Sequence, residues 1–395
     1  MSQLVAALDS SHVFAPMTQP LPAPGLEVEL RRDLDVHPDD EAAIEALVAA
    51  RPEVGVFVSK PWLSGFFADC PPGTEQALLL FRKDGRLRAI VPVAVSVTMT
   101  HVRVRLLGGA LGSDRVDLLA ARGFEATAAE TFLAWLRGTF GGRGFVLELR
   151  DVCGTSPLWG AIHRSGMERT QRLTLQPREI YPAPYLSLNG GEAENAADSP
   201  SSAALRSMQK HRRWLERRCR VRIDLLAEHG AVLEAFECLA RFLGARWRGH
   251  GGSVLDNHGA LRFHRHVLPL LLDAGRLRMM RISADARTVA VFYGLAAGRW
   301  WGYYLAGYDR EWAGRIHLGL VNLSAAIDLA AREGAAEFDF LKGAERVKYT
   351  WPVRERTTLD ADVFSENVSV QLTRATRATR DATAALTKSA RALFS

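Results

Sequence analysis

Polar and apolar residues alternate in a short stretch near the C-terminal end of the chain. The run Glu337-Phe338-Asp339-Phe340-Leu341 closes on two apolar residues, which predicts a mostly buried strand over residues 337–341. Gly343 ends it, because glycine permits a turn that a bulkier residue would resist. An acid, a base, a phenol and an indole follow: Glu345, Lys348, Tyr349 and Trp351. Polar groups just past a buried strand are where α/β proteins place ligand chemistry, so we expect a functional site here.

The same succession of predicted elements occurs twice along the chain. An Asp-Gly turn between two apolar runs is typical of a β-hairpin, and it lies in the first copy. This copy has strands Ala77–Phe81, Leu87–Val97 and Val102–Leu107, helix Ala126–Leu136, strand Phe145–Leu149 and helix Leu158–Ser165. The second has strands Leu277–Ser283, Val289–Ala296 and Arg299–Ala306, helix Leu318–Arg332 and strand Glu337–Leu341. The pattern predicts two copies of one α/β unit.

Local composition divides the chain into five predicted segments. Residues 1–25 are rich in proline and predict a flexible lead-in, and residues 26–186 hold the first copy. Small, polar residues predict a linker over 187–201. The second copy occupies 202–365, and a weakly amphipathic basic helix forms the tail over 366–395. At 395 residues the chain also exceeds the usual size of a single core, which favours two domains.

Overall composition and charge are those of an ordinary globular protein. The chain has 50 basic and 44 acidic residues, a net charge of +6 that is too diffuse to indicate nucleic acid by itself. No apolar run is long enough to span a bilayer, and the N-terminus lacks a secretory signal, so we expect a cytoplasmic protein. Four widely spaced cysteines predict free thiols: Cys70, Cys153, Cys219 and Cys238.

Several catalytic signatures are absent from the sequence. It has no GxSxG, no P-loop, no GxGxxG after a strand and no HExxH, which argues against the common hydrolases, NTPases, dehydrogenases and zincins. Four histidines cluster, but their spacing fits no standard zinc pattern, so no metal is expected: His250, His258, His264 and His266.

A predicted helix start near Leu318-Gly319 follows an aromatic strand. Helix N-termini offer unpaired N–H groups and a partial positive charge, which suit an anion such as a pyrophosphate. Arg315 would add a forked cation beside them. The alternative is that Gly314 and Gly319 merely shape a loop.

Two basic segments, the helix up to Arg220 and the C-terminal tail, suggest binding to anionic partners. A helix beginning at Ser201 or Ser202 carries many cations, including Arg206, up to Arg220. A nucleic-acid surface, a solvated face, or docking onto acidic lipid or polysaccharide machinery all fit it. The tail is compatible with an anionic membrane surface, although its Ala- and Thr-rich face fits an exposed or oligomerising helix better.

The C-terminal half resembles the CelD/BcsL-type acetyltransferases, a branch of the GNAT superfamily related to the FemAB peptidyltransferases. Residues 338–351, FDFLKGAERVKYTW, follow a pattern of the type FDFL-x-G-x-E-x-x-K-x-x-W. Leu305-Ala306-Gly307-Tyr308-Asp309, the helix start at Gly319 and Leu205-Arg206-Ser207 support the match, whereas residues 315–319 fit the phosphate-loop pattern only partly. The resemblance covers about Ala203 to Trp351. With the repeat, it implies tandem GNAT-like domains, with mixed central sheets flanked by helices.

The resemblance implies acetyl-CoA or another acyl-CoA as co-substrate. Acyl transfer from a thioester needs a proton acceptor, an oxyanion donor and an anchor for the CoA phosphates. In GNATs the strand before the phosphate loop supplies a backbone N–H, here within Tyr303–Ala306. The implied cofactor-binding residues are Tyr303, Leu305, Arg315, Leu318 and Gly319.

The catalytic residues are expected among Asp339, Glu345, His317 and Tyr304. Asp339 lies between two phenylalanines, where burial would raise the pKa of a carboxyl group; the alternative is that it pairs with Lys348 or Arg346 only to hold the loop. Tyr304 is a proton donor or a packing residue. The expected substrate-binding residues are Lys348, Tyr349, Trp351 and Arg206.

Three functions follow from these patterns. The first is an acyl-CoA-dependent N- or O-acyltransferase. The resemblance to CelD/BcsL-type enzymes implies small-molecule or sugar-linked acceptors of the cell envelope or exopolysaccharides. The second is a FemAB-like transferase that uses aminoacyl-tRNA. The third is a non-catalytic tandem-GNAT scaffold that binds a partner through the basic helix.

Overall fold

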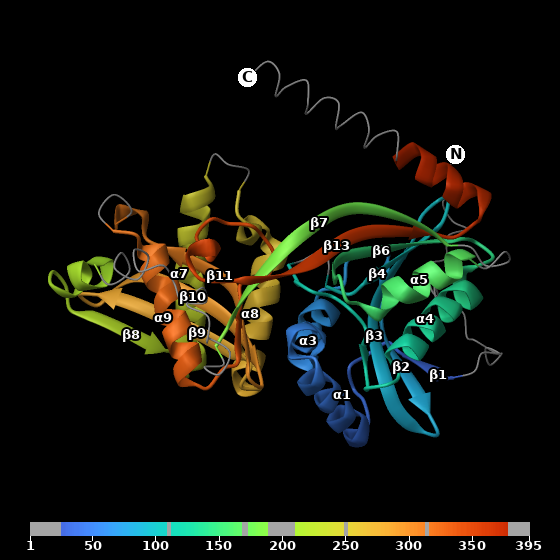
Figure 1. The fold of residues 1–395 in the computed structure, drawn as a ribbon, viewed down its shortest axis with the longest axis horizontal. Helices are drawn as coiled ribbons and strands as arrows, with labels where there is room; N and C mark the ends of the chain where they lie inside the picture. Colours follow the sequence, from blue (N-terminus) through green and yellow to red (C-terminus); the bar gives the residue numbers. More distant parts are fainter. Residues whose placement is uncertain are drawn as a thin grey trace, which may run out of the picture.

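The computed structural model describes residues 25–108, 112–167, 173–188, 210–248, 252–312 and 316–377. Figure 1 shows two α/β halves joined by a long pair of strands. We call residues 25–167 the N-terminal half and residues 210–353 the C-terminal half. The joining strands, which we call the bridging strands, are β7 (Thr174–Ser187) and β13 (Arg354–Phe364).

The N-terminal half contains β1 (Glu27–Arg31), α1 (Pro38–Ala50), α2 (Pro52–Val58), α3 (Lys60–Ala68), β2 (Thr74–Lys83), β3 (Arg86–Val97), β4 (Val102–Leu106), β5 (Leu119–Ala120), α4 (Glu125–Phe140), β6 (Phe145–Cys153) and α5 (Pro157–Met167). The C-terminal half contains β8 (Val221–Leu225), α7 (His229–Trp247), α8 (His258–Asp273), β9 (Leu277–Ala284), β10 (Arg287–Ala297), β11 (Trp300–Tyr308), α9 (Leu318–Arg332) and β12 (Glu337–Asp339). Residues 210–216 and 368–377 are helical.

The strands form one mixed sheet that runs through both halves. Their order is β1-β2-β3-β4-β6-β13-β7-β12-β11-β10-β9-β8, with β5 beside β3. β13, although it follows the C-terminal half in sequence, lies between β6 and β7. β7 in turn ends beside β12. The halves therefore exchange strands, and β13, which follows the C-terminal half in sequence, completes the sheet of the N-terminal half.

Both predicted hairpins are present, and their turns have the backbone that tight hairpins need. Asp84 and Gly85 have φ of +51° and +72°, and Asp285 and Ala286 have +49° and +66°. Two successive positive φ values match the right-handed twist of the paired strands. The predicted order of hairpin, strand, helix and strand is confirmed in both halves.

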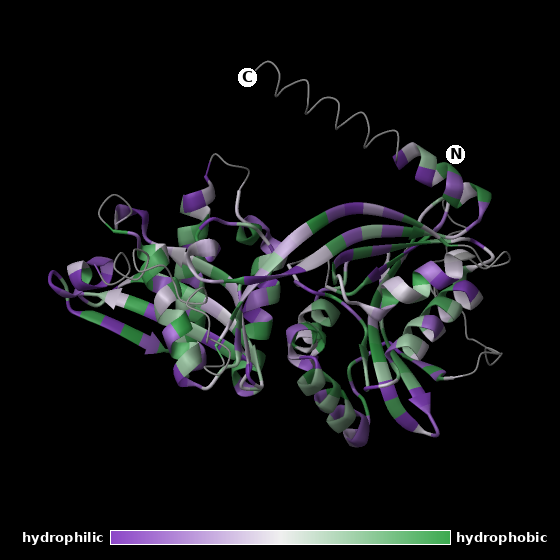
Figure 2. Cartoon of the chain, viewed as in Figure 1, coloured by the Kyte–Doolittle hydropathy of each residue, from purple (hydrophilic) through white to green (hydrophobic). Residues whose placement is uncertain are grey.

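Apolar spacing determines which helix faces are buried. In α4 the buried positions include Ala128, Ala129, Phe132, Leu133 and Leu136, the three- and four-residue spacing of one helical face. They pack with β-strand residues in the core of the N-terminal half. Figure 2 shows apolar residues concentrated on the central strands and inward helix faces.

A second core joins the two halves. It contains Trp62 and Phe66 from α3, together with Phe263 and Val267 from α8. The Phe66 and Phe263 rings lie 4.6 Å apart between centroids. The halves are therefore packed against each other as well as linked by strands.

Some sequence predictions need correction or lie outside the described residues. The strand predicted over 337–341 ends at Asp339, because Leu341 has a φ of +55° that strand backbone does not adopt. The lead-in lies outside the described residues except Gly25, as do all but two residues of the linker and the tail beyond residue 377. All four cysteines are free thiols, as predicted. Within the described ranges, the helices are too short or too polar to cross a bilayer.

Candidate active site

β11 and β12 diverge after a short parallel pairing. Trp300, Trp301 and Gly302 pair with Glu337, Phe338 and Asp339, yet β11 continues to Tyr308. Beyond Asp339 the chain turns to the other neighbour: the N–H of Phe340 donates to the carbonyl of Pro184 at 2.9 Å. Within the described residues, β11 from Tyr303 onwards therefore presents an edge that β12 does not cover. Tyr303, Tyr304 and Leu305 lie on this diverging stretch.

α9 begins beside the diverging stretch. Its first turn has no acidic residue, and no described side chain caps it. Gly319 lies against β11, because a Cβ there would be 3.0 Å from the Tyr308 ring. His317 is exposed at the helix start. Leu318, in contrast, is fully buried in the core, and Arg315 lies outside the described residues.

The basic helix reaches the start of α9. The His211 ring lies 5.0 Å from that of His317, centroid to centroid. Partial burial, His317 and Lys210 lower the pKa of His211. His211 of the basic helix therefore lies beside the helix start that was predicted to bind phosphate. Arg206 lies outside the described residues.

Asp339 is fully buried, and donors surround its carboxylate. Arg115, 1% exposed, forms an ion pair with it across the two halves, with Nη2 2.7 Å from Oδ1. The Trp300 indole donates to Oδ2 at 3.2 Å, and the Leu341 N–H donates to Oδ1 at 2.8 Å. The sequence offered Lys348 or Arg346 as the cation that pairs with Asp339. In the structure Arg115 is that cation, and Arg356 Nη1 lies 3.4 Å from Asp339 Oδ2.

The loop after β12 is held by Lys348. This amine is 3% exposed and lies 2.7 Å from the Glu345 carboxylate. It also donates to the carbonyl oxygen of Lys342 at 2.7 Å. Glu345 is largely exposed and lies near Tyr303, where burial and this carboxylate raise the pKa of the phenol to about 12.

Tyr349 and Trp351, which were expected to bind substrate, contact other side chains of the protein. The Tyr349 hydroxyl donates to Glu355 at 2.5 Å, and that bond, with partial burial, raises the pKa of Tyr349 to about 12. Trp351 is buried and lies 5.9 Å from the Phe340 ring. Both side chains support the loop in this structure.

The Tyr304 hydroxyl ends a buried polar chain. It lies 3.4 Å from His264 Nε2, and His264 Nδ1 lies 3.4 Å from the Tyr293 hydroxyl. Burial lowers the pKa of His264 to about 3, so its imidazole is neutral, and burial raises that of Tyr304 well above 10. The Tyr304 hydroxyl also touches Gly112 of the N-terminal half, where a Cβ would lie 2.8 Å from it.

The loop after β4 therefore reaches into the C-terminal half, and sequence reasoning missed this. Gly112 contacts Tyr304 and Arg115 contacts Asp339. Between them, Ser113 accepts the indole N–H of Trp62, which belongs to the N-terminal half, at 2.7 Å. Three non-glycine residues at this junction have positive φ: Arg115 (+56°), Asp151 (+54°) and Leu341 (+55°). Such backbone strain gathers at functional sites.

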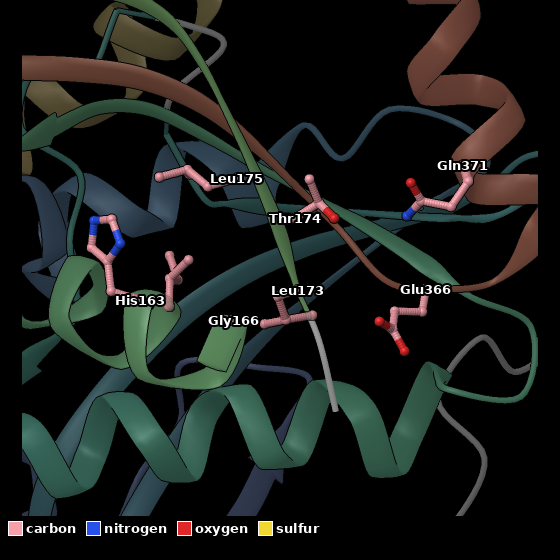
Figure 3. A pocket seen from close by; sticks show the side chains of 8 residues that line it. His163, Gly166, Leu173, Thr174, Leu175, Glu366 and Gln371 are labelled. Carbon is pink, nitrogen blue, oxygen red and sulfur yellow. The ribbon is translucent and has the colours of Figure 1, made fainter. Parts of the chain in front are cut away.

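Two surface pockets lie elsewhere. One of about 630 Å³ is lined by residues of α5, the start of β7 and the segment after β13; Figure 3 shows His163, Thr174, Glu366 and Gln371 around it. Another of about 480 Å³ lies between the basic helix, β8 and α9. No predicted site residue lines either pocket. Within the described ranges, no group of His, Cys, Asp and Glu is arranged to hold a metal ion.

Comparisons with known proteins find a similar domain in part of the chain and similar folds among solved structures. Residues 202–349 match a family model described as an acetyltransferase (GNAT) domain. The solved structure of FemX is similar at 9% identity and a TM-score of 0.57, covering 88% of this chain and 99% of that one. A protein of unknown function from Bacteroides thetaiotaomicron VPI-5482 is similar at 11% identity and a TM-score of 0.51, covering 86% and 99%. The comparison with curated proteins found no match.

These findings confirm the predicted fold. The matched domain contains β11, α9 and β12, and both structural relatives extend over nearly the whole chain. The molecule is a mixed α/β protein with one large mixed sheet flanked by helices, and residues 202–349 match the GNAT domain. The match of residues 202–349 to the GNAT domain model supports the prediction that the protein is an acyltransferase.

Proposed function

We propose that this protein transfers an acyl group from acyl-CoA, with acetyl-CoA as the simplest donor, to an amine or hydroxyl acceptor. The divergence of β11 from β12 beside the start of α9 carries the proposal. An extended thioester arm would lie along the uncovered edge of β11, and its phosphates would meet the start of α9. The acceptor attacks the thioester carbon, the C–S bond breaks, and the thiol leaves.

The residues of this chain supply three parts of that chemistry. Backbone N–H groups of Tyr303–Ala306 would donate to the developing oxyanion. Tyr304, which burial keeps protonated, would give a proton to the leaving thiolate. Gly319, His317 and the neighbouring His211 would accommodate the phosphates.

Asp339 takes a positioning role in this proposal. Its carboxylate already accepts from Arg115, Trp300 and the N–H of Leu341. It therefore connects the diverging strands to the N-terminal half. Glu345 and His317 are exposed and remain acid–base candidates.

The resemblance to CelD/BcsL-type enzymes extends the proposal to the acceptor. Sugar-linked acceptors of the envelope or exopolysaccharides, handled in the cytoplasm, fit that resemblance. The many polar groups along the bridging strands, visible in Figure 2, suit a hydrophilic acceptor.

A FemAB-like transfer from aminoacyl-tRNA is the second candidate. The observation that favours it is the basic helix beside the start of α9. A chain of cations there would follow a nucleic-acid backbone. An anionic membrane surface or a biosynthetic complex is a further partner that this helix and the tail would fit.

Calorimetric titration with acetyl-CoA tests the proposal. We expect saturable binding, weakened by Ala306→Trp, which would add a large side chain on the face of β11 that borders the core residues of α9. Ala375→Trp, on the exposed helix after β13, is the control and should leave binding unchanged. Absence of binding to the unmodified protein would reject the acyl-CoA proposal, and stabilisation by aminoacyl-tRNA would then favour the second candidate. If the protein responds to neither donor, the non-catalytic scaffold that binds a partner is the function that agrees with the result.

With binding established, labelled acetyl-CoA and a panel of sugar, amine and peptide acceptors would identify the acceptor class. Transfer to an amine but not to the matching alcohol would assign N-acylation.

A further inference from the structure

Among the large apolar side chains that the structure describes, the three most exposed lie on two adjacent segments. Met99 is 98% exposed, Val368 78% and Leu372 64%. Met99 lies in the turn between β3 and β4, and the other two lie one helical turn apart on the helix after β13. The hydroxyl oxygens of Thr100 in the turn and Thr373 in the helix are 3.4 Å apart, so the two segments are in contact. We call Met99, Val368 and Leu372 the apolar patch.

A closed turn holds Met99 outward. The Thr98 N–H donates to the carbonyl oxygen of His101 at 2.9 Å, and the Thr98 hydroxyl donates to the same oxygen at 2.7 Å. His101 is buried and fixes the base of the turn. Arg143, in the loop between α4 and β6, donates to the carbonyl oxygen of Thr98 at 3.1 Å. The turn therefore presents Met99 to solvent while its own backbone is bonded.

The helix after β13 is anchored on the face opposite to its exposed apolar residues. Val370 is fully buried and packs with Val146 and Phe364. Arg377 pairs with Asp362 at 2.8 Å and with a carboxylate of β6 at 3.2 Å. Positions two residues before and after a buried residue lie about 200° around a helix, so the two apolar residues of the patch point away from this anchor. Figure 1 shows the helix at the outer margin of the N-terminal half.

Two cations flank the apolar patch. Arg143 is exposed and reaches the turn, and Arg374 lies on the helix, where it donates to Gln371 at 3.0 Å. Neither of these arginines forms an ion pair among the residues that the structure describes. Glu366 is the acid nearest to the helix in sequence, and its side chain lines the pocket beside α5 (Figure 3). The surroundings of the patch therefore favour an anionic partner.

The size of the patch fits a lipid surface better than a protein partner. A stable protein interface buries roughly 800 Å² on each side, and three side chains offer far less than that. Apolar side chains flanked by arginines are instead typical of segments that lie in a membrane interface. The sequence that follows has the same sign of charge. Residues 378–395 contain three basic residues and one acidic residue: Arg380, Lys388, Arg391 and Asp381.

We propose that the apolar patch inserts into the surface of an anionic lipid bilayer while Arg143 and Arg374 bind the headgroup phosphates. The apolar side chains leave water, and the guanidinium groups stay at the polar boundary. This inference goes beyond acyl transfer and does not rest on it. The helix packs on β6, whereas the acyl donor is proposed to bind at β11 and α9, so each can be tested without the other.

The first test is co-sedimentation with vesicles of phosphatidylcholine, with and without phosphatidylglycerol. We expect the unmodified full chain to bind the anionic vesicles, and the double variant Met99→Gln with Leu372→Gln to bind them at least about tenfold more weakly. Leu225→Gln is the control, because Leu225 is 40% exposed on β8, at the other end of the sheet. Thermal unfolding verifies that the variants fold. Full affinity in the double variant would overturn the proposal.

The second test concerns the cations. Arg143→Gln and Arg374→Gln should each weaken binding to the anionic vesicles about fivefold, and high salt should weaken it further in the unmodified protein. Arg212→Gln, on the basic helix, should bind normally. Weaker binding in Arg212→Gln alone would assign the contact to the basic helix and contradict the proposal.

The third test distinguishes insertion from adsorption. An environment-sensitive dye is attached to Met99→Cys in a chain that also carries Cys70→Ser and Cys219→Ser, since Cys70 is exposed and Cys219 half-buried. Its emission should shift to the blue when anionic vesicles are added, and the dye on Leu225→Cys should not respond. Equal shifts at both positions would show unspecific adsorption. A dye at position 99 that is already blue-shifted without vesicles would show that the chain or a second copy covers the patch. Either result would overturn the proposal.

Calorimetry with acetyl-CoA keeps this inference apart from the proposed function. The variants of the apolar patch should bind the donor as the unmodified protein does. Failure of the unmodified protein to bind acetyl-CoA would reject the acyl-CoA function, whereas failure to bind vesicles would reject only the membrane contact.

Discussion

The two halves contain the same succession of elements but differ in how far their two parallel strands pair. In the N-terminal half, β4 has five residues and four of them, Val102–Arg105, pair with β6. In the C-terminal half, β11 has nine residues and only the first three pair with β12. Among the residues that the structure describes, one half is therefore closed at this position, and the other presents an uncovered strand edge.

The N-terminal ends of α4 and α9 differ as well. α4 begins with Glu125, whose carboxylate accepts the N–H of Gly123 at 2.7 Å. α9 has no acidic residue in its first turn, and its N-cap residue His317 lies beside His211 of the basic helix. A carboxylate at a helix start occupies N–H groups that an anionic ligand would need. The two halves thus repeat one succession of elements but differ at the place where we propose that the acyl donor binds.

Separating the halves should have the largest effect. We expect a fragment of residues 25–188 to lack a cooperative thermal transition, because without β13 the facing edges of β6 and β7 are unpaired. Circular dichroism during heating measures this. Co-expression with residues 210–377 should restore the transition, and independent folding of either fragment would show that strand exchange is dispensable.

Breaking the ion pair between the halves comes next. Arg115→Leu leaves the buried Asp339 carboxylate without its main partner and should lower the free energy of unfolding by about 3–5 kcal/mol. Urea unfolding measures the change. Arg212→Ala, which removes an exposed pair with Glu216, is the control at about 0.5 kcal/mol. Equal losses would mean that the junction is not coupled to stability.

Acidification should weaken the core between the halves through His264. Its pKa of about 3 in the folded state lies below that of an unfolded histidine, so the unfolded state binds more protons between about pH 6.5 and 3. The free energy of unfolding should therefore fall by about 2 kcal/mol from this residue between pH 7 and 5. His264→Gln should remove that part of the fall in urea unfolding, whereas His266→Gln, on the exposed face of the same helix, should keep it.

Making α9 resemble α4 should have the smallest effect. Leu320→Glu places a carboxylate in the first turn of α9 and should weaken acetyl-CoA binding about tenfold, or about 1.4 kcal/mol. Leu320→Gln has the same shape without the charge and should bind nearly normally. The reciprocal change, Glu125→Gln in the other half, should leave the affinity unaltered. Calorimetry that finds equal affinities throughout would remove the distinction between the two helix starts.

Local patterns were sufficient for the repeated elements. Asp84-Gly85 predicted its hairpin because that dipeptide accepts two positive φ values, and the apolar spacing of α4 predicted its buried face. The strand ending at Asp339 was found with its end two residues too late, since the positive φ of Leu341 depends on its surroundings rather than on its own preference.

The sequence by itself determined two α/β units and the order of their strands and helices, and it predicts the stretch around Asp339 as a place for chemistry. Only the tertiary structure decided what that stretch contacts. Arg115 lies 224 residues away from Asp339 along the chain, and the two meet in a sheet whose halves exchange β13 and β7. Hydrophobic periodicity is a local property that identifies faces, whereas an ion pair depends on distances that the exchanged strands set.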